Sequence, residues 1–354
     1  MRILIVALAV FSMASCASDS RDMPYATGIS GDLYLVMDSV QWRGPLGRTI
    51  DSIFSAEMPG LPRKESIFKL RWINPRKLNY VLKRSRNLIF VMTLDKKGEG
   101  AQIVKKLFTL ESIEKIKSNS TQFSMMDDNV FAKNQLIMYL FGKDEKTLLQ
   151  NIRSNRGRLI DYFDQKERQR LAAALFKGGG VRGISETISK DYQCNLQVPF
   201  GFKIADKSKD FIWLRQVNPR DDKDIFIARK PYTSMDDFKK ENILHFRNEI
   251  CGKYLFGDPD RPDSYLTTET RPYIPITTDT VNFNGNFAMR VRGLFRSNDY
   301  LLGGPFEGFA VVDEGTRQFY YIEGFTISPR VNQREIMREL ETILYSFKTS
   351  PEIP

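Results

Sequence analysis

Few side chains in this sequence are placed for acid–base or metal chemistry. The only histidine, His245, stands between Glu241 and Glu249, one helical turn from each. Two carboxylates and an imidazole on one helix face could hold a metal or tune a general base. However, Ile243 and Phe246 define the buried side of this helix, and His245 points away from it. We therefore expect an exposed ion-pair ladder here, with no metal and no cofactor.

Three cysteines are too few to staple a chain of 354 residues. Cys194 and Cys251 could form one disulfide if their Cα atoms lie within about 7 Å of each other. Two separate buried thiols fit the sequence equally well. Neither cysteine has a histidine or a second cysteine nearby that would mark a catalytic thiol. Because no nucleophile, metal or dinucleotide motif appears either, no catalytic residue is assigned.

The third cysteine, Cys16, follows a short apolar segment at the start of the chain. Residues 3–14 carry no charge, and as a helix they would rise about 18 Å, less than the roughly 30 Å of a hydrocarbon core. A cleavable signal peptide over residues 1–15 therefore fits better than a membrane span. The sequence Met13-Ala14-Ser15-Cys16 resembles the lipobox of bacterial lipoproteins. An ordinary secretory signal with an incidental cysteine is the alternative.

The lipobox resemblance implies a lipid anchor on Cys16. After cleavage this residue would carry two acyl chains on its sulfur and a palmitate-type chain on its amine. Several chains, each contributing about 0.8 kcal/mol per buried CH₂, make a stable membrane anchor. Residues 16–28 would then be a tether. We expect a cell-envelope location, with the outer membrane favoured because no Asp follows Cys16.

The charge balance is basic, with 53 Lys and Arg against 43 Asp and Glu. Such a chain is attracted to phosphate-rich surfaces, which outside the cytoplasm are lipid headgroups and lipopolysaccharide. The basic residues are scattered among acidic ones, and no stacking-aromatic motif is present. We therefore expect no nucleic-acid partner. The expected partners are the membrane, through Cys16, and an envelope protein or glycan.

An apolar, glycine-rich segment at residues 301–306 precedes a predicted strand. Together with the three tryptophans it could line a groove for a peptide or sugar, although core aromatics are the commoner explanation. The candidate binding residues are Trp42, Trp72, Trp213, Gly303, Gly304 and Phe306.

Apolar periodicity predicts an α+β fold in two halves, each a sheet with helices packed on it and mainly antiparallel strands. The expected divisions are an N-terminal half over 29–176, a glycine-rich hinge over 177–186 and a C-terminal half over 187–350. Strands are predicted near residues 31–38, 68–73, 87–94, 135–141, 192–198, 211–217, 224–229, 287–294, 306–313 and 318–327. Helices are predicted from residue 45 and over 110–116, 144–176, 234–254 and 332–347.

The lipobox and several segments of the folded chain resemble the Bacteroidota lipoprotein family called domain of unknown function 4837. The segments are 33–42, 58–65, 303–306, 323–325 and 337–341. The likeness covers nearly the whole mature chain and implies no activity and no catalytic residue.

Residues 198–202 and 343–347 look like the Mog1/PsbP-type α/β/α sandwich. That resemblance implies a sandwich for the second half and a protein-binding or assembly role. We therefore expect a lipid-anchored envelope protein that is a non-enzymatic binding or assembly module. The alternative is an envelope glycan- or peptide-hydrolysing enzyme that uses carboxylates.

Overall fold

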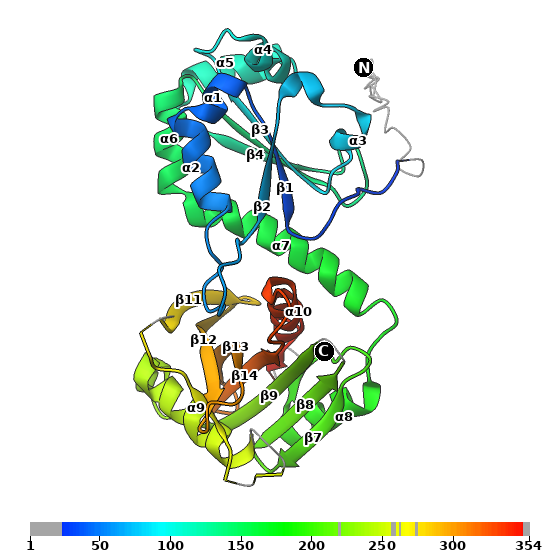
Figure 1. Cartoon of the computed structure of the whole chain (residues 1–354), viewed down its shortest axis with the longest axis vertical. Helices are drawn as coiled ribbons and strands as arrows, with labels where there is room; N and C mark the ends of the chain where they lie inside the picture. The colour runs from blue at the N-terminus through cyan, green and yellow to red at the C-terminus, as the bar shows by residue number, and fades with distance from the viewer. Residues whose placement is uncertain (1–22, 219–220, 256–259, 262, 273–274, 350–354) are drawn as a thin grey trace, which may run out of the picture.

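The computed structural model describes residues 23–218, 221–255, 260–261, 263–272 and 275–349. These residues form two sheets with helices, one in an N-terminal unit (23–176) and one in a C-terminal unit (177–349), stacked along the long axis (Figure 1). The predicted α+β class is confirmed. The signal peptide, Cys16 and the first part of the tether lie outside the described residues. Within the described ranges, no helix is both long and apolar enough to cross a membrane.

The N-terminal sheet has five strands in the order β2-β1-β3-β5-β4. The strands are β1 (Asp32–Val36), β2 (Lys69–Ile73), β3 (Asn87–Thr93), β4 (Ser124–Asp128) and β5 (Leu136–Gly142). Strands β1, β2, β3 and β5 are parallel, and only β4 on the edge is antiparallel. The prediction of mainly antiparallel strands is right for the chain as a whole but not for this sheet. Parallel neighbours arise here because helical crossovers join the successive strands.

Helices cover both faces of this sheet. They are α1 (Ser39–Arg43), α2 (Pro45–Phe54), α3 (Tyr80–Lys83), α4 (Glu99–Lys105), α5 (Leu110–Ser118), α6 (Glu145–Ser154) and α7 (Arg156–Leu175), with a 3₁₀ turn at Pro75–Lys77. Helices α2, α6 and α7 pack on one face through Ile50, Leu148 and Phe163. Helices α4 and α5 pack on the other face through Val104 and Ile116. Every residue of β3 and β5 is buried, as parallel strands covered on both faces require.

The main C-terminal sheet is wholly antiparallel, in the order β10-β12-β13-β14-β9-β8-β7 with β11 also paired to β12. Its strands are β7 (Lys203–Ser208), β8 (Phe211–Val217), β9 (Asp222–Pro231), β10 (Leu266–Thr268), β11 (Thr277–Phe283), β12 (Asn286–Ser297), β13 (Gly303–Asp313) and β14 (Gln318–Ile327). Two short strands, β6 (Cys194–Asn195) and β15 (Lys348–Thr349), pair separately. The strands predicted near 306–313 and 318–327 are β13 and β14, which pair as a hairpin around Glu314 and Gly315.

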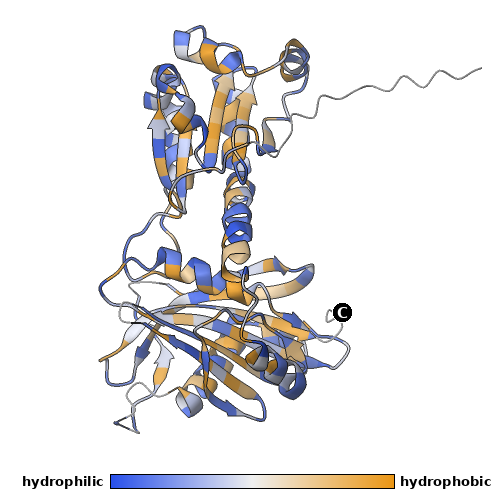
Figure 2. Cartoon of the chain, turned by 90° about the vertical axis from the view of Figure 1, so that its right-hand side faces the viewer, coloured by the Kyte–Doolittle hydropathy of each residue, from blue (hydrophilic) through white to orange (hydrophobic). Residues whose placement is uncertain are grey.

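Three helices enclose the C-terminal sheet, namely α8 (Arg182–Tyr192), α9 (Lys240–Tyr254) and α10 (Arg334–Leu344), with a 3₁₀ turn at Met235–Phe238. Helices α8 and α10 share a core with Tyr320, while α9 shares the other core with the next residue, Tyr321. Successive strand residues point to opposite faces of a sheet, so these helices lie on opposite sides. The predicted α/β/α sandwich is confirmed, and Figure 2 shows hydrophobic residues along the strands of both sheets.

The glycine-rich segment after α7 is packed against the segment around Val198 in the C-terminal unit. Residues 182–186 of the predicted hinge are the start of α8. The Val181 N–H donates to Val198 O at 2.8 Å. A Cβ on Gly180 would lie 2.5 Å from Val198 O, so this close approach requires glycine.

Candidate functional site

Helix α7 crosses from the N-terminal unit to the C-terminal unit and lies against α10 (Figure 1). Near its start, Leu159 and Phe163 are buried in the N-terminal core. At its end, Leu175 and the adjoining Phe176 pack on the C-terminal core. One helix therefore belongs to both units, and the residues along its middle face the junction.

A loop of the N-terminal unit, residues 57–67, makes a second connection across the junction. Leu61 is buried in the C-terminal core, and Arg63 Nη2 donates to Pro329 O at 2.6 Å. Glu65 accepts the N–H groups of Gln333 and Arg334, at 2.7 and 3.1 Å, where α10 begins. The side chain of the N-cap residue itself, Gln333, makes no capping hydrogen bond to the first turn of α10. The N-terminal unit therefore supplies the helix cap.

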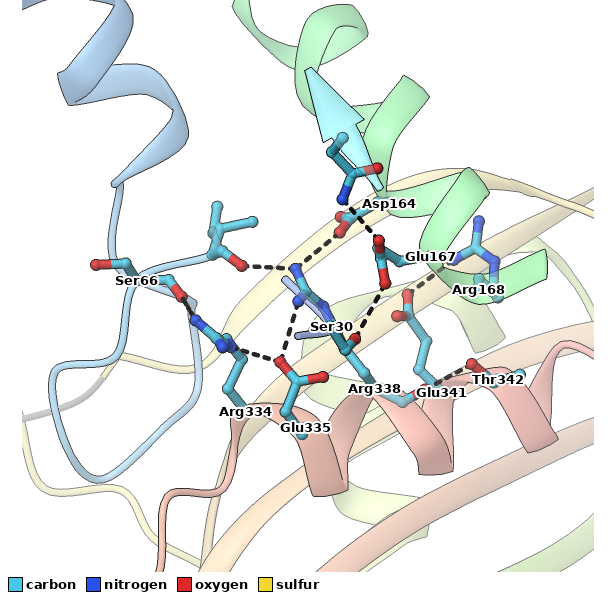
Figure 3. Close-up of polar contacts among 12 residues, drawn as sticks. Ser30, Ser66, Asp164, Glu167, Arg168, Arg334, Glu335, Arg338, Glu341 and Thr342 are labelled. Carbon is cyan, nitrogen blue, oxygen red and sulfur yellow. Dashed lines mark hydrogen bonds and ion pairs between the residues drawn. The ribbon is translucent and has the colours of Figure 1, made fainter. Parts of the chain in front are cut away.

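Arg338 is the most connected side chain of the junction (Figure 3). Its Nη2 donates to Ile67 O at 2.6 Å and to Asp164 Oδ1 at 3.2 Å. Its Nη1 donates to Glu335 Oε1 at 3.3 Å, and its guanidinium lies 4.8 Å from the centre of the Phe68 ring. Arg338 thus joins α10 to both α7 and the 57–67 loop.

Two carboxylates, the partly exposed Asp164 and the buried Glu307, line a small cavity behind this network. Burial, reinforced by the nearby Glu341 carboxylate, raises the pKa of Glu307 to about 7. Burial likewise raises the pKa of Asp164 to about 6, against the opposing effect of Arg338. Raised carboxyl pKa values are a feature of catalytic acids, so these two groups are candidates for acid–base chemistry.

The cavity between these carboxylates is too small for a substrate. Its volume of about 40 Å³ holds about three or four waters at about 10–15 Å³ each, and no sugar ring. Glu307 is only 1% exposed, and its Oε1 has no hydrogen-bond partner among the described residues. The pair therefore gives no support to the hydrolase alternative.

A larger groove, of about 420 Å³, opens beside the junction between α7, the end of α10 and the β11–β12 turn. We call it the junction groove. Its polar lining residues are Gln165, Arg168, Gln169, Gln197, Asn282, Asn284, Thr342 and Ser346, and its other lining residues are Ala172, Phe176 and Tyr345. Gln165, Arg168 and Gln169 share one face of α7 because they are three and four residues apart.

The walls of the junction groove are held by their own hydrogen bonds. Arg168 Nη1 donates to Glu341 Oε1 at 3.1 Å, and its guanidinium lies 3.8 Å from the centre of the Tyr345 ring. Asn284 Nδ2 donates to Tyr345 O at 2.9 Å, and Ser346 Oγ accepts the Gln197 N–H at 3.0 Å. The exposed side-chain amides of Gln165 and Gln169 make no hydrogen bond to the described residues. They are therefore available to a ligand.

Another hollow, of about 600 Å³, lies between the segment at residues 25–30 and the opposite face of α7. Glu167, which is 3% exposed, lies at its floor. Its carboxylate accepts from Asn87 Nδ2 at 2.7 Å, from Arg170 Nη1 at 2.6 Å and from Ser30 Oγ at 3.0 Å. Because these donors already satisfy it, Glu167 joins segments of the N-terminal unit and is not aimed at a ligand.

The three tryptophans predicted as binding residues do not lie on one surface. Trp42 and Trp72 stack with ring centres 6.2 Å apart in the N-terminal unit, where Trp72 Nε1 donates to Met37 O. Trp213 lies in the C-terminal unit and donates to Asp224 Oδ1 at 2.9 Å. Sequence alone could not show that the tryptophans lie apart, because local spacing does not indicate where each ring packs in the folded chain.

Gly303, Gly304 and Phe306 lie in strand β13 and do not form a groove with the tryptophans. A Cβ on Gly304 would lie 2.0 Å from Thr326 O on the adjoining strand. Phe306 is 1% exposed, with the Arg247 guanidinium 3.8 Å from its ring centre. Gly304 and Phe306 are buried strand positions and Gly303 is an exposed one, so the structure does not bring these residues together with the tryptophans as the predicted groove required.

Cys194 and Cys251 are both free and buried, so the possible disulfide is not formed. Cys194 belongs to the core under α8 and α10, whereas Cys251 belongs to the core under α9, on the other face of the sheet. Burial raises the pKa of both thiols to about 12. His245 is exposed and lies 3.2 Å from Glu249. Across the described part of the chain, no group of three or more metal-binding side chains occurs.

A family model described as Domain of unknown function (DUF4837) matches residues 182–346. The predicted resemblance to that family is confirmed. The expectation that this likeness covers nearly the whole mature chain is wrong, since the match is confined to the C-terminal unit. A different model, described as Domain of unknown function (DUF8532), matches residues 26–176. The two matches end on either side of the glycine-rich segment, and neither family has an assigned activity.

Among solved structures, the chain is similar to the Ran-binding protein Mog1p of Saccharomyces cerevisiae. The identity is 9%, the match covers 45% of this chain and 90% of Mog1p, and the TM-score is 0.30. It is also similar to a STAR-related lipid transfer protein fragment from Xanthomonas axonopodis, at 13% identity, with 41% and 94% covered and a TM-score of 0.22. No curated protein matches the sequence.

Proposed function

We propose that this chain is a lipid-anchored cell-envelope protein that binds a glycan in the junction groove without catalysing a reaction on it. The observation that carries the proposal is the set of carboxamides in the groove, from Gln165, Gln169, Gln197, Asn282 and Asn284. The family matches leave the activity open, so the argument depends on the chemistry of these side chains.

Carboxamides suit a ligand rich in hydroxyl groups. A carboxamide has an NH₂ donor and a carbonyl acceptor, and a sugar hydroxyl both donates and accepts. Gln165 and Gln169 offer both groups to a ligand. Asn284 offers its carbonyl, because its NH₂ already donates to two backbone carbonyls, and Asn282 offers its NH₂, because its carbonyl accepts the Gly285 N–H. The groove volume of about 420 Å³ lies within the roughly 300–1,000 Å³ of small-ligand sites. A peptide ligand would need apolar pockets or an open strand edge. The aromatic face of Tyr345 is covered by Arg168 and packed on Phe283, which leaves polar groups to contact the ligand.

The anchor part of the proposal depends on Cys16 in its lipobox-like context. We expect a palmitate analogue to label the wild-type protein and not a Cys16→Ala variant. Protease treatment of intact cells then separates a surface location from a periplasmic one. An unlabelled wild-type protein would remove the anchor from the proposal.

The groove is tested with Gln165→Ala/Gln169→Ala against the matched control Gln122→Ala/Gln150→Ala, which removes two exposed glutamines of the N-terminal unit. The probes are an array of bacterial envelope oligosaccharides that includes peptidoglycan fragments, followed by calorimetry with each oligosaccharide that binds. Two lost hydrogen bonds, each contributing about 0.5–1.5 kcal/mol, should weaken binding by about fivefold or more. The control should bind like the wild type. Equal affinity in all three proteins, or no binding on the array, would contradict the proposal.

A further inference from the structure

Three cation–aromatic pairs lie together where the N-terminal segment joins the N-terminal unit. Lys133 lies 5.7 Å from the ring centre of Tyr25, Arg84 lies 5.4 Å from that of Tyr80, and Lys83 lies 5.5 Å from that of Phe131. Two exposed valines lie in the same segments. We call this surface the tether platform: Tyr25, Tyr80, Val81, Lys83, Arg84, Val130, Phe131 and Lys133.

The platform is assembled from three segments, 24–27, 79–85 and 130–135, that hydrogen bonds hold as one surface. Lys133 N donates to Pro24 O at 2.8 Å, and Thr27 N donates to Arg84 O at 2.9 Å. Gln135, which is fully buried, donates to Lys83 O at 2.6 Å and accepts the Phe131 N–H at 2.9 Å. The exposed side chains therefore stand on a fixed backbone.

The platform combines exposed apolar groups with positive charge. Tyr25, Tyr80 and Val81 are each about two-thirds exposed, and Val130 is 37% exposed. The three segments contain three basic residues and no acidic residue. Tyrosines prefer the headgroup region of a bilayer, and lysines beside them can reach lipid phosphates. Exposed apolar side chains beside positive charges are therefore suited to contact with an anionic phospholipid surface.

The platform also lies where such a surface would be. Met23, the first described residue, is seven residue steps after Cys16, and at about 3.3–3.6 Å each these steps span at most about 25 Å. A chain acylated at Cys16 therefore keeps the platform close to the bilayer. We infer that the tether platform docks on the anionic phospholipid surface of the membrane that holds the anchor. The location rests on the proposed anchor, whereas the binding chemistry does not.

The test measures lipid binding without the anchor, so that the two ideas fail separately. A chain that begins at Ala17 keeps every residue that the structure describes. Its partition is measured by co-sedimentation with vesicles of phosphatidylcholine, alone or with about one-third phosphatidylglycerol, at low salt. We expect binding only to the anionic vesicles.

The matched variants are Lys83→Gln/Lys133→Gln on the platform and Lys106→Gln/Lys190→Gln on exposed positions elsewhere. Two cations near an anionic surface together contribute about 30-fold to the partition, so the platform variant should lose about that factor. The control should stay within about twofold of the wild type. Equal losses in both variants would show attraction by net charge alone and would overturn the inference, as would equal binding to both kinds of vesicle.

A second measurement reports the orientation of the bound protein. Val81→Cys and Val217→Cys introduce thiols at positions that are 67% and 65% exposed, and the buried Cys194 and Cys251 are protected from labelling. An environment-sensitive fluorophore at position 81 should become shielded from an aqueous quencher on anionic vesicles, and one at position 217 should not. Equal shielding would overturn the inference. The groove variant Gln165→Ala/Gln169→Ala should dock normally, which separates this result from the glycan proposal.

Discussion

Glu65 of the N-terminal unit caps α10 of the C-terminal unit, with its Oε1 2.7 Å from the backbone N of Gln333. The first N–H groups of a helix have no partner inside the helix, and they favour a negative charge. A cap usually comes from the residue just before the helix, but here it comes from 268 positions earlier in the chain. The stability of α10 therefore depends on the N-terminal unit being in place.

Replacing this cap should destabilise the protein without damaging either core. We expect Glu65→Ala to lower the free energy of unfolding by about 1–2 kcal/mol, because two N–H groups lose their acceptor. Glu57→Ala removes an exposed carboxylate of the same loop and should cost less than about 0.5 kcal/mol. Urea titrations of both variants measure the difference. Equal midpoints would mean that the cap contributes nothing.

Breaking the buried ion pair between Arg247 and Glu323 should strongly destabilise the protein. Two guanidinium nitrogens donate to the carboxylate at 2.7 Å, and both side chains are at most 1% exposed. Arg247→Met leaves a buried carboxylate without its partner, so we expect a loss of about 3–5 kcal/mol. Adding Glu323→Met should restore most of the stability, because the double variant buries no charge. A double variant as unstable as the single one would contradict this account; thermal and urea unfolding give the comparison.

Glu307 should make the protein less stable as the pH rises from about 4.5 to 7. Burial raises its pKa from 4.5 to about 7, so in this interval the folded state binds a proton that the unfolded state has released. The free energy of unfolding therefore falls with rising pH, by on the order of 3 kcal/mol. Glu307→Gln should remove this part of the slope, and the exposed Glu57→Gln should not. Urea midpoints at pH 5 and pH 8 test it, and parallel slopes in all three proteins would refute it.

The native thiols should be inert in the folded protein. Cys194 and Cys251 are fully buried and their pKa values are raised to about 12, which leaves almost no thiolate at neutral pH. A chain beginning at Ala17 should therefore react with a disulfide reagent only after denaturant is added, and then with two equivalents. Reductant should leave its Tm unchanged. A fall in Tm with reductant would indicate a disulfide.

Local patterns explain which parts of the fold were predictable from sequence. Ser234 and Asp237 form a capping box where the predicted helix over 234–254 begins, and the predicted helix over 144–176 is present but divided at Asn155 into α6 and α7. The parallel N-terminal sheet was missed, although the unbroken apolar runs of β3 and β5 are typical of such strands. These apolar runs are visible in the sequence and could have been interpreted as parallel strands covered on both faces.

The junction could not be found in the same way. Glu65, Asp164 and Arg338 come from three distant segments, and no local spacing relates them. Gln165 and Gln169 left a weak indication, since two glutamines four apart on a helix share a face. Only the packing of α7 on α10 shows that this face borders a groove.

The two connections across the junction also bear on the glycan binding that we propose for the junction groove. A single helix would let the C-terminal unit swing and twist about its axis, but the 57–67 loop joins the units at a second place along the junction (Figure 1). The groove takes one wall from α7 and the others from the C-terminal unit, so its width is set before any ligand arrives. Binding then requires no closing motion and loses little entropy to ordering the walls. Loosening the loop should therefore weaken the affinity of the groove even though no residue of the loop lines it.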